Sequence, residues 1–222
     1  MSRTQLIAVL ALAGVSSTAS AQSTAWQRKW YWGGQGGMMF YTTNLMSGTQ
    51  SAILGGGHWL ITGKRSALYI GVDQVKYADS STTAIADASA ASTGGLRTMS
   101  FSSGRMLQAG IYIIPNDGNL QFMTGGGFAI NEITDAVPVV DPLATQQEKT
   151  AAAQAVDDAT TKAFLWVSAG LQLRAGRWAL FGSYQYMPAA KDFAIDTGIQ
   201  WLSVGLRFAL TSAHEDVTTS EK

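Results

Sequence analysis

Histidine is the side chain that most often acts as a general base, and this chain has only two, His58 and His214. A nucleophilic triad needs such a base beside a serine and an orienting carboxylate. His214 lies in the polar segment 211–222, where we expect a solvated side chain, whereas His58 follows Gly55-Gly56-Gly57. Two histidines this far apart lack the spacing of a metal-ligand pair, and no cysteine assists them. We therefore predict no catalytic residue, no metal ligand and no cofactor.

Three glycine runs, at 33–37, 55–57 and 125–127, invite comparison with phosphate-binding loops. None of them leads into a helix that begins with Lys followed by Ser or Thr, as a P-loop requires. Glycine inside a strand permits sharp bending and close packing of neighbouring strands. We interpret the runs as structural glycines of β-strands.

The N-terminus has the order of a secretory signal peptide: Arg3, an apolar run from Leu6 to Val15, then Ala19-Ser20-Ala21 before Gln22. The alternative, an uncleaved membrane helix, needs about 20 apolar residues, and this run has about ten. We expect a signal peptide at 1–21, one domain over 22–210 and a polar C-terminal tail at 211–222.

The composition of the chain limits its partners and its environment. The formal net charge is zero, which argues against nucleic acid as a partner. There is no cysteine, so neither disulfides nor thiolate chemistry contribute. Charged residues make up 14% of the chain, well below the roughly 25% of soluble proteins, while glycine and aromatic residues are abundant. This balance favours strands that face lipid.

Alternating or β-rich segments divide the chain after residue 22 into an even number of strands, as a closed bacterial barrel needs. We predict strands at 29–41, 51–62, 66–77, 97–114, 119–133, 163–175, 177–187 and 198–210. The fourth is longer than a membrane crossing, so Arg97 to Phe101 is expected to project above the bilayer as a continuation of the ribbon.

The connections between these strands are alternately short and long. Turn-forming residues occupy the short ones: Gly63-Lys64-Arg65, Pro115-Asn116-Asp117-Gly118 and Ala175-Gly176-Arg177. The long ones, 42–50, 78–96, 134–162 and 188–197, are rich in Ser, Thr, Ala and Asp. This alternation predicts an all-β, up-and-down antiparallel transmembrane barrel of about eight strands, with short periplasmic turns and long extracellular loops.

Charges indicate which face of each strand meets lipid, since a lipid-facing Arg or Lys at mid-membrane costs about 2–4 kcal/mol. We expect the following to face lipid: Trp30, Trp32, Met38 and Phe40; Leu68, Ile70 and Val72; Ala163, Leu165, Val167, Ala169, Leu171 and Leu173; and Leu202, Val204, Leu206, Phe208 and Leu210. Both faces of the strand 51–62 carry apolar residues, so neither face can be assigned to lipid and the register of this strand stays undetermined. A polar network inside the barrel is predicted from Asp73, Glu132, Gln172, Arg174 and Arg207.

Aromatic residues near strand ends are predicted to form two girdles at headgroup depth, the alternative being ordinary aromatics of a soluble core. They are Trp30, Tyr31, Trp32, Tyr41, Tyr77, Trp178, Tyr184 and Tyr186. The loop 134–162 has helix propensity, with Asp141 as a candidate N-cap and Pro142 at the first helical position. Its apolar positions are mostly alanine, which predicts a short exposed helix or disorder.

Together these features resemble the small outer-membrane β-barrel superfamily of opacity-type and OmpA-like transmembrane domains. The most specific part is the last strand, Trp201 to Phe208, which resembles the C-terminal assembly signal of such proteins. The resemblance implies the bacterial outer membrane as location, with membrane lipid, lipopolysaccharide and the barrel assembly machinery as partners. Because the segment 211–222 is short, we do not predict cell-wall anchoring by a peptidoglycan-binding domain like that of full-length OmpA relatives.

An eight-stranded barrel has an interior just wide enough for its own side chains, which disfavours a wide pore. The leading hypothesis is a non-enzymatic barrel for envelope structure, or for surface interaction through the loops 78–96 and 134–162. Alternatives are a narrow solute channel, a lipid-modifying enzyme and a secreted soluble ligand carrier. Barrel lipid A deacylases use a His-x-Ser pair, whereas here Leu60 stands two residues after His58.

Overall fold

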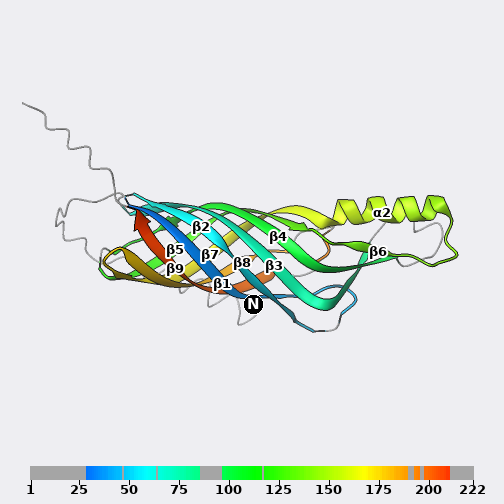
Figure 1. Cartoon of the computed structure of the whole chain (residues 1–222), viewed down its shortest axis with the longest axis horizontal. Coiled ribbons are helices and arrows are strands. Elements are labelled where there is room, and N and C mark those ends of the chain that lie inside the picture. The colour runs from blue at the N-terminus through cyan, green and yellow to red at the C-terminus, as the bar shows by residue number, and fades with distance from the viewer. Residues whose placement is uncertain are drawn as a thin grey trace, which may run out of the picture.

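The computed structural model describes residues 29–46, 48–63, 65–85, 97–116, 118–189, 193–195 and 198–210. The predicted signal peptide 1–21 and the tail 211–222 lie outside these residues. Eight long strands form the body: β1 Trp30–Tyr41, β2 Gln50–Thr62, β3 Ser66–Ile85, β4 Arg97–Ile113, β5 Leu120–Ile133, β7 Thr161–Ala175, β8 Trp178–Met187 and β9 Ile199–Leu210. A three-residue strand, β6 Val137–Val139, and a helix, α2 Gln146–Thr160, lie between β5 and β7 (Figure 1).

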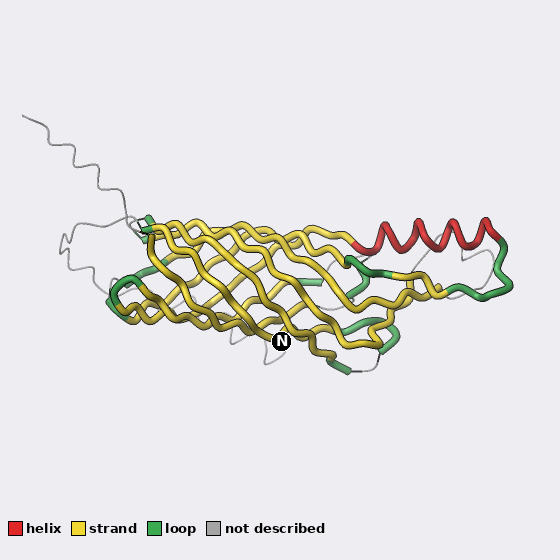
Figure 2. Tube along the Cα trace, viewed as in Figure 1, coloured by secondary structure: helices red, strands yellow, loops and turns green. Residues whose placement is uncertain are grey.

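Every long strand pairs antiparallel with its two neighbours, and β1 closes the sheet by pairing with β9 from Trp30↔Leu210 to Phe40↔Gln200. The result is a closed up-and-down barrel (Figure 2), as predicted. The short connections gather at one end, called here the turn end, and the long connections at the other, called the loop end. Among the described residues, no helix is both long enough and apolar enough to cross a bilayer.

The predicted strand bounds are confirmed within about two residues, except at the loop end of β3. The segment 78–85, predicted as loop, continues β3 and pairs with the projecting start of β4, from Ser81↔Phe101 to Ile85↔Arg97. A register shift between Lys76 and Ser81 separates this ribbon from the barrel wall. The predicted continuation of the ribbon at Arg97 to Phe101 is therefore confirmed, with a partner strand that the sequence did not reveal.

Side chains alternate between the outer surface and the lumen as predicted for β1, β3, β7 and β9. The exposed residues of β9, for example, include Leu202, Val204 and Leu206, while Ser203 and Arg207 are buried. The structure also settles β2, whose Ile53 and Trp59 face outward and whose His58 faces the lumen. The outward positions of these strands are mostly apolar, so a band of apolar side chains surrounds the closed barrel.

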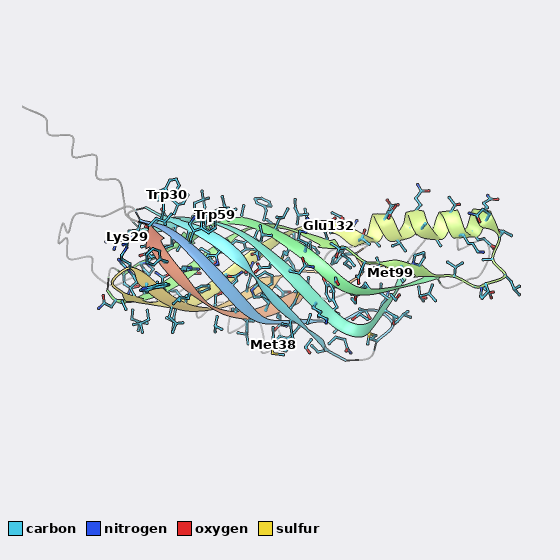
Figure 3. All side chains as sticks on the ribbon, viewed as in Figure 1. Lys29, Trp30, Met38, Trp59, Met99 and Glu132 are labelled. Carbon is cyan, nitrogen blue, oxygen red and sulfur yellow. The ribbon has the colours of Figure 1, made fainter. Side chains whose placement is uncertain are left out.

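The two predicted aromatic girdles are only partly confirmed. Trp30, Trp32, Trp59 and Trp178 are exposed near the turn end, with Trp32 and Trp59 edge to face at 4.5 Å. Figure 3 labels Trp30 and Trp59 there. Tyr184 and Tyr186 are exposed on β8 towards the loop end. The prediction was wrong for Tyr31, Tyr41 and Tyr77, which occupy inward positions of their strands and are buried.

Glycine is required where neighbouring strands approach closely inside this narrow barrel. A Cβ at Gly37 would lie 2.0 Å from the Leu202 carbonyl oxygen, and one at Gly127 would lie 2.1 Å from that of Ala109. Both obstacles are backbone atoms that cannot rotate away. The interpretation of the glycine runs as structural is consistent with these contacts.

Candidate functional site: the lumen and the loop-end extension

A buried cation lies in the lumen on β9. Arg207 is 2% exposed, and its Nε donates to His58 Nε2 over 2.8 Å. Its Nη1 donates to Gln172 Oε1 over 2.5 Å, and the guanidinium stacks 3.8 Å from the centre of the Phe181 ring. Every one of these partners is uncharged, so hydrogen bonds and a cation–π contact offset the desolvation of the guanidinium.

A buried carboxylate on β3 has its own set of partners. Asp73 is fully buried and accepts from Gln35 Nε2 at 2.8 and 2.9 Å and from Gln108 Nε2 at 3.1 Å. Gln108 Oε1 in turn accepts from Gln185 Nε2 over 2.8 Å. These side chains come from β1, β3, β4 and β8, so the chain of hydrogen bonds crosses the lumen.

The predicted lumen network is thus correct for Asp73, Gln172 and Arg207, but its composition differs from the prediction. Glu132 was wrongly included, because it occupies an outward position of β5 and is exposed (Figure 3). Arg174 faces inward at the turn end, where its buried Nε has no hydrogen-bond partner. The sequence also missed Gln35, Gln108 and Gln185, although their inward positions in alternating strands were a usable signal.

Large side chains fill the rest of the lumen. Those that are almost fully buried include Trp166, Trp201, Tyr41, Tyr77, Met39, Met106, Met123 and Met187. This filling agrees with the packing expected of an eight-stranded barrel. His58 lines the lumen, and its hydrogen-bonded neighbour is Arg207 and not an orienting carboxylate. Within the described ranges no group of three or more His, Asp or Glu residues is arranged to hold a metal ion.

At the loop end, the ribbon of β3 and β4, strand β6 and helix α2 form a projection beyond the barrel wall (Figure 1), called here the extension. Strand β6 pairs with β4 from Thr98↔Val139 to Ser100↔Val137. Asp135 fastens the base of the extension: Oδ1 accepts from the backbone N–H groups of Ser102 and Ser103 at 2.9 and 2.7 Å, and Oδ2 accepts from the Ser102 hydroxyl. Partial burial acts to raise the pKa of Asp135, but these hydrogen bonds to the ionised form outweigh it and lower the pKa.

Helix α2 begins four residues later than the sequence suggested. Its N-cap is Thr145, which forms a capping box with Glu148, whereas the Asp141 carboxylate accepts from the Leu143 N–H in the preceding turn. The predicted capping by Asp141 and Pro142 was therefore wrong, although a helix in this loop is confirmed. The residues buried by α2 are Ala152, Val156 and Ala159, so one face of the helix is packed and not exposed.

The long loops contact each other, so the extension is braced at its root. The Ala194 N–H donates to the Ala159 carbonyl over 3.3 Å, and the Phe164 and Phe193 rings pack edge to face at 5.1 Å. Farther out, Val137 and Val139 are more than half exposed and Leu143 is 92% exposed. The extension thus holds apolar side chains in solvent on an ordered support.

Comparison with known proteins gives a likeness in structure but none in sequence. No family model matches the chain, and no curated protein matches it. The crystal structure of Neisserial surface protein A superposes with a TM-score of 0.55 at 12% identity, covering 81% of this chain and 96% of that one. The N-terminal barrel of Pseudomonas aeruginosa OprF gives 0.46 at 11%, covering 83% and 100%. Ail of Yersinia pestis, in complex with sucrose octasulfate, gives 0.41 at 9%, covering 83% and 100%. The closed barrel and the likeness to Neisserial surface protein A together show that this chain has the fold of the small eight-stranded outer-membrane β-barrels.

Proposed function

We propose that this chain is a non-enzymatic integral protein of the bacterial outer membrane whose extension presents a surface to a partner. The observation that carries the proposal is the division of the barrel into an apolar outside and a filled inside. Outward positions from β1 to β9 are mostly apolar, while the lumen holds hydrogen-bonded polar groups and large side chains. Such a barrel is stable in a bilayer and leaves its ends to interact with other molecules.

The alternatives fit the structure less well. A soluble ligand carrier needs a polar outer face and space for a ligand inside, whereas the outer face here is mostly apolar and large side chains fill the lumen. A solute channel needs an open path, whereas Arg207, Gln172 and Phe181 occupy the lumen on one level and the Asp73 hydrogen-bond chain crosses it on another. A lipid-modifying enzyme needs an activated nucleophile, and His58 is hydrogen-bonded to a cation inside the barrel.

The extension is the surface best suited to a partner. Val137, Val139 and Leu143 expose apolar area, and within the described residues β6 is the last strand of its sheet and pairs with β4 alone. Exposed apolar residues on an ordered support are typical of interaction sites. Membrane lipid, lipopolysaccharide and the barrel assembly machinery are proposed partners of the barrel itself, and an unidentified surface partner is proposed for the loops 78–96 and 134–162.

Because the chain has no cysteine, a single introduced thiol tests both location and orientation. We expect Leu143→Cys, on the extension, to react with a membrane-impermeant maleimide on intact cells. Arg177→Cys, exposed in a turn at the opposite end, is the matched control and should react only after the outer membrane is permeabilised. Labelling of Arg177→Cys alone on intact cells would reverse the orientation, and a soluble, detergent-free product would refute the membrane assignment.

Two further measurements separate the alternatives. A folded barrel should migrate faster on SDS gels unheated than boiled, with the slow form appearing on heating. In a planar bilayer the filled lumen predicts no steady conductance. A stable open channel would instead favour the solute-channel hypothesis.

A further inference from the structure

Three cationic side chains gather in the turn-end half of the lumen. Lys29 immediately precedes β1, and Arg174 lies at the end of β7 (Figure 3 labels Lys29). Ala179 of β8 pairs with Arg174 on one side and with Arg207 on the other, so the two arginines share one level and one face of the sheet. Strands lie about 4.8 Å apart, which places their Cα atoms about 10 Å apart around the wall.

Carboxylates do not balance this charge within the described part of the chain. The buried carboxylate of the lumen, Asp73, is held by Gln35 and Gln108, and the partners of Arg207 are neutral. The charged side chains described in the three turns are Arg65 and Arg177. The turn-end mouth therefore carries a concentrated positive potential, which low-dielectric walls strengthen.

Arg174 and Lys29 form a cationic pair that lacks an acceptor and a counter-charge among the described residues. The Arg174 Nε is buried and has no hydrogen-bond partner, which is costly for a charged donor. Burial lowers the pKa of Lys29, and the nearby Arg174 charge lowers it further. An anion between the two side chains would supply the missing acceptor and remove the repulsion.

We propose that the turn-end mouth of the lumen binds a phosphate group between Lys29 and Arg174. A guanidinium offers parallel N–H donors that match two phosphate oxygens, and an ammonium adds a compact second charge. Two cations match the charge of a phosphate dianion, and the deeper Arg207 adds to the attraction. The group has two candidate sources, free phosphate and the headgroup of an anionic phospholipid. This site does not depend on the surface role proposed for the extension.

The first test follows the Arg174 Nε–Hε resonance of the folded, 15N-labelled chain in neutral detergent during titration with inorganic phosphate at constant ionic strength. We expect a saturable shift that chloride does not reproduce. Lys29→Gln should weaken apparent phosphate affinity about tenfold, whereas Lys149→Gln, the same charge change on α2, should leave it unchanged. Arg174→Lys keeps the charge but removes both the fork and the Nε–Hε reporter, so its phosphate affinity is measured by isothermal titration calorimetry beside the native chain, and it should be weaker.

The second test identifies the source. Nanodiscs of phosphatidylglycerol should shift the Nε–Hε resonance without added phosphate if a lipid headgroup is the ligand, while phosphatidylcholine nanodiscs should not. Absence of a saturable shift in both tests, or an equal loss of affinity in Lys29→Gln and Lys149→Gln, would overturn the proposal. So would phosphate binding that appears only in Asp117→Asn or after removal of 211–222, because one of the chain's own carboxylates would then be the natural counter-ion.

Discussion

The assignment of the outer face to lipid can be tested by placing one charge at different depths along β9. Its outward residues run from Gln200 at the loop end to Leu210 at the turn end. The apolar part, Leu202 to Leu210, spans eight steps of about 3.3 Å, or about 26 Å along the strand. A tilt of about 40° reduces this span to about 20 Å along the membrane normal, close to the apolar band of known barrels.

Leu206 lies at the middle of that span, and Gln200 lies at its polar border. We therefore expect Leu206→Arg to lower the free energy of unfolding by about 2–4 kcal/mol, and Gln200→Arg by about 0–1 kcal/mol. Leu206→Met is the control, because it changes the side chain at the same site without adding charge. The barrel wall itself is unaltered in all three variants, so the difference isolates the transfer of charge into lipid.

The assay is reversible unfolding of the barrel by guanidinium in lipid vesicles, followed by tryptophan fluorescence and by the heat-dependent gel shift. The order of destabilisation should be Leu206→Arg, then Gln200→Arg, then Leu206→Met. Equal costs for the two arginine variants would refute the depth assignment. A cost for Leu206→Arg below about 1 kcal/mol would indicate that this face meets water.

Three other predictions concern the lumen and the extension. Asp73→Leu leaves the Gln108 amide without its acceptor and should lower the free energy of unfolding by about 1–3 kcal/mol. Gln108→Leu should then be less destabilising in the Asp73→Leu background than in the native chain. Additive losses of stability in this double-mutant cycle would contradict the contact. Thr145→Ala removes the capping box and should destabilise α2 by about 1 kcal/mol, seen as faster amide exchange in the helix and not in the barrel. Folding lowers the pKa of Asp135, so its hydrogen bonds to Ser102 should be fully present above the ordinary Asp pKa of 3.8 and should be lost as the pH falls through the lower folded value. Hydrogen exchange at the Ser102 amide should show this pH dependence. Asp135→Asn should abolish it.

The strands of the barrel wall could be predicted because an apolar outer face and a packed lumen require a two-residue alternation. In β9 that pattern places Leu202, Val204 and Leu206 outside and gave the bounds within about one residue. The end of β3 lacks the signal, since a ribbon beyond the barrel wall is not required to present an apolar outer face, and Ser81 to Ile85 resembles a polar loop in sequence. Its strand structure comes from pairing with β4, a contact between segments that are distant in sequence.

The lumen was harder to predict than the wall. The alternation indicated that Asp73 and Arg207 face inward, and the need to pair buried charges suggested that they would share a network. In the structure Asp73 accepts hydrogen bonds from side-chain amides, whereas Arg207 donates to the His58 imidazole and to an amide oxygen. Which side chains meet depends on where their strands lie around the barrel, and the sequence pattern does not give that arrangement. Glu132 was assigned to the wrong face although it alternates with buried Asn131, a signal that counting along β5 would have supplied. The capping box of Thr145 and Glu148 was likewise readable from the sequence.

The order of the extension bears directly on how it would bind. A disordered loop loses conformational freedom when it meets a partner, whereas a segment that is already ordered loses much less. Here β6 is paired to β4, and α2 is capped at Thr145 and joined to the neighbouring loop through Ala159. Thr145→Ala should therefore weaken binding of any partner that contacts Leu143, even without touching the partner itself, because the support of the contact becomes less ordered. If affinity instead changes only when exposed residues are replaced, the extension is a flexible ligand and its order in the free protein has no part in recognition.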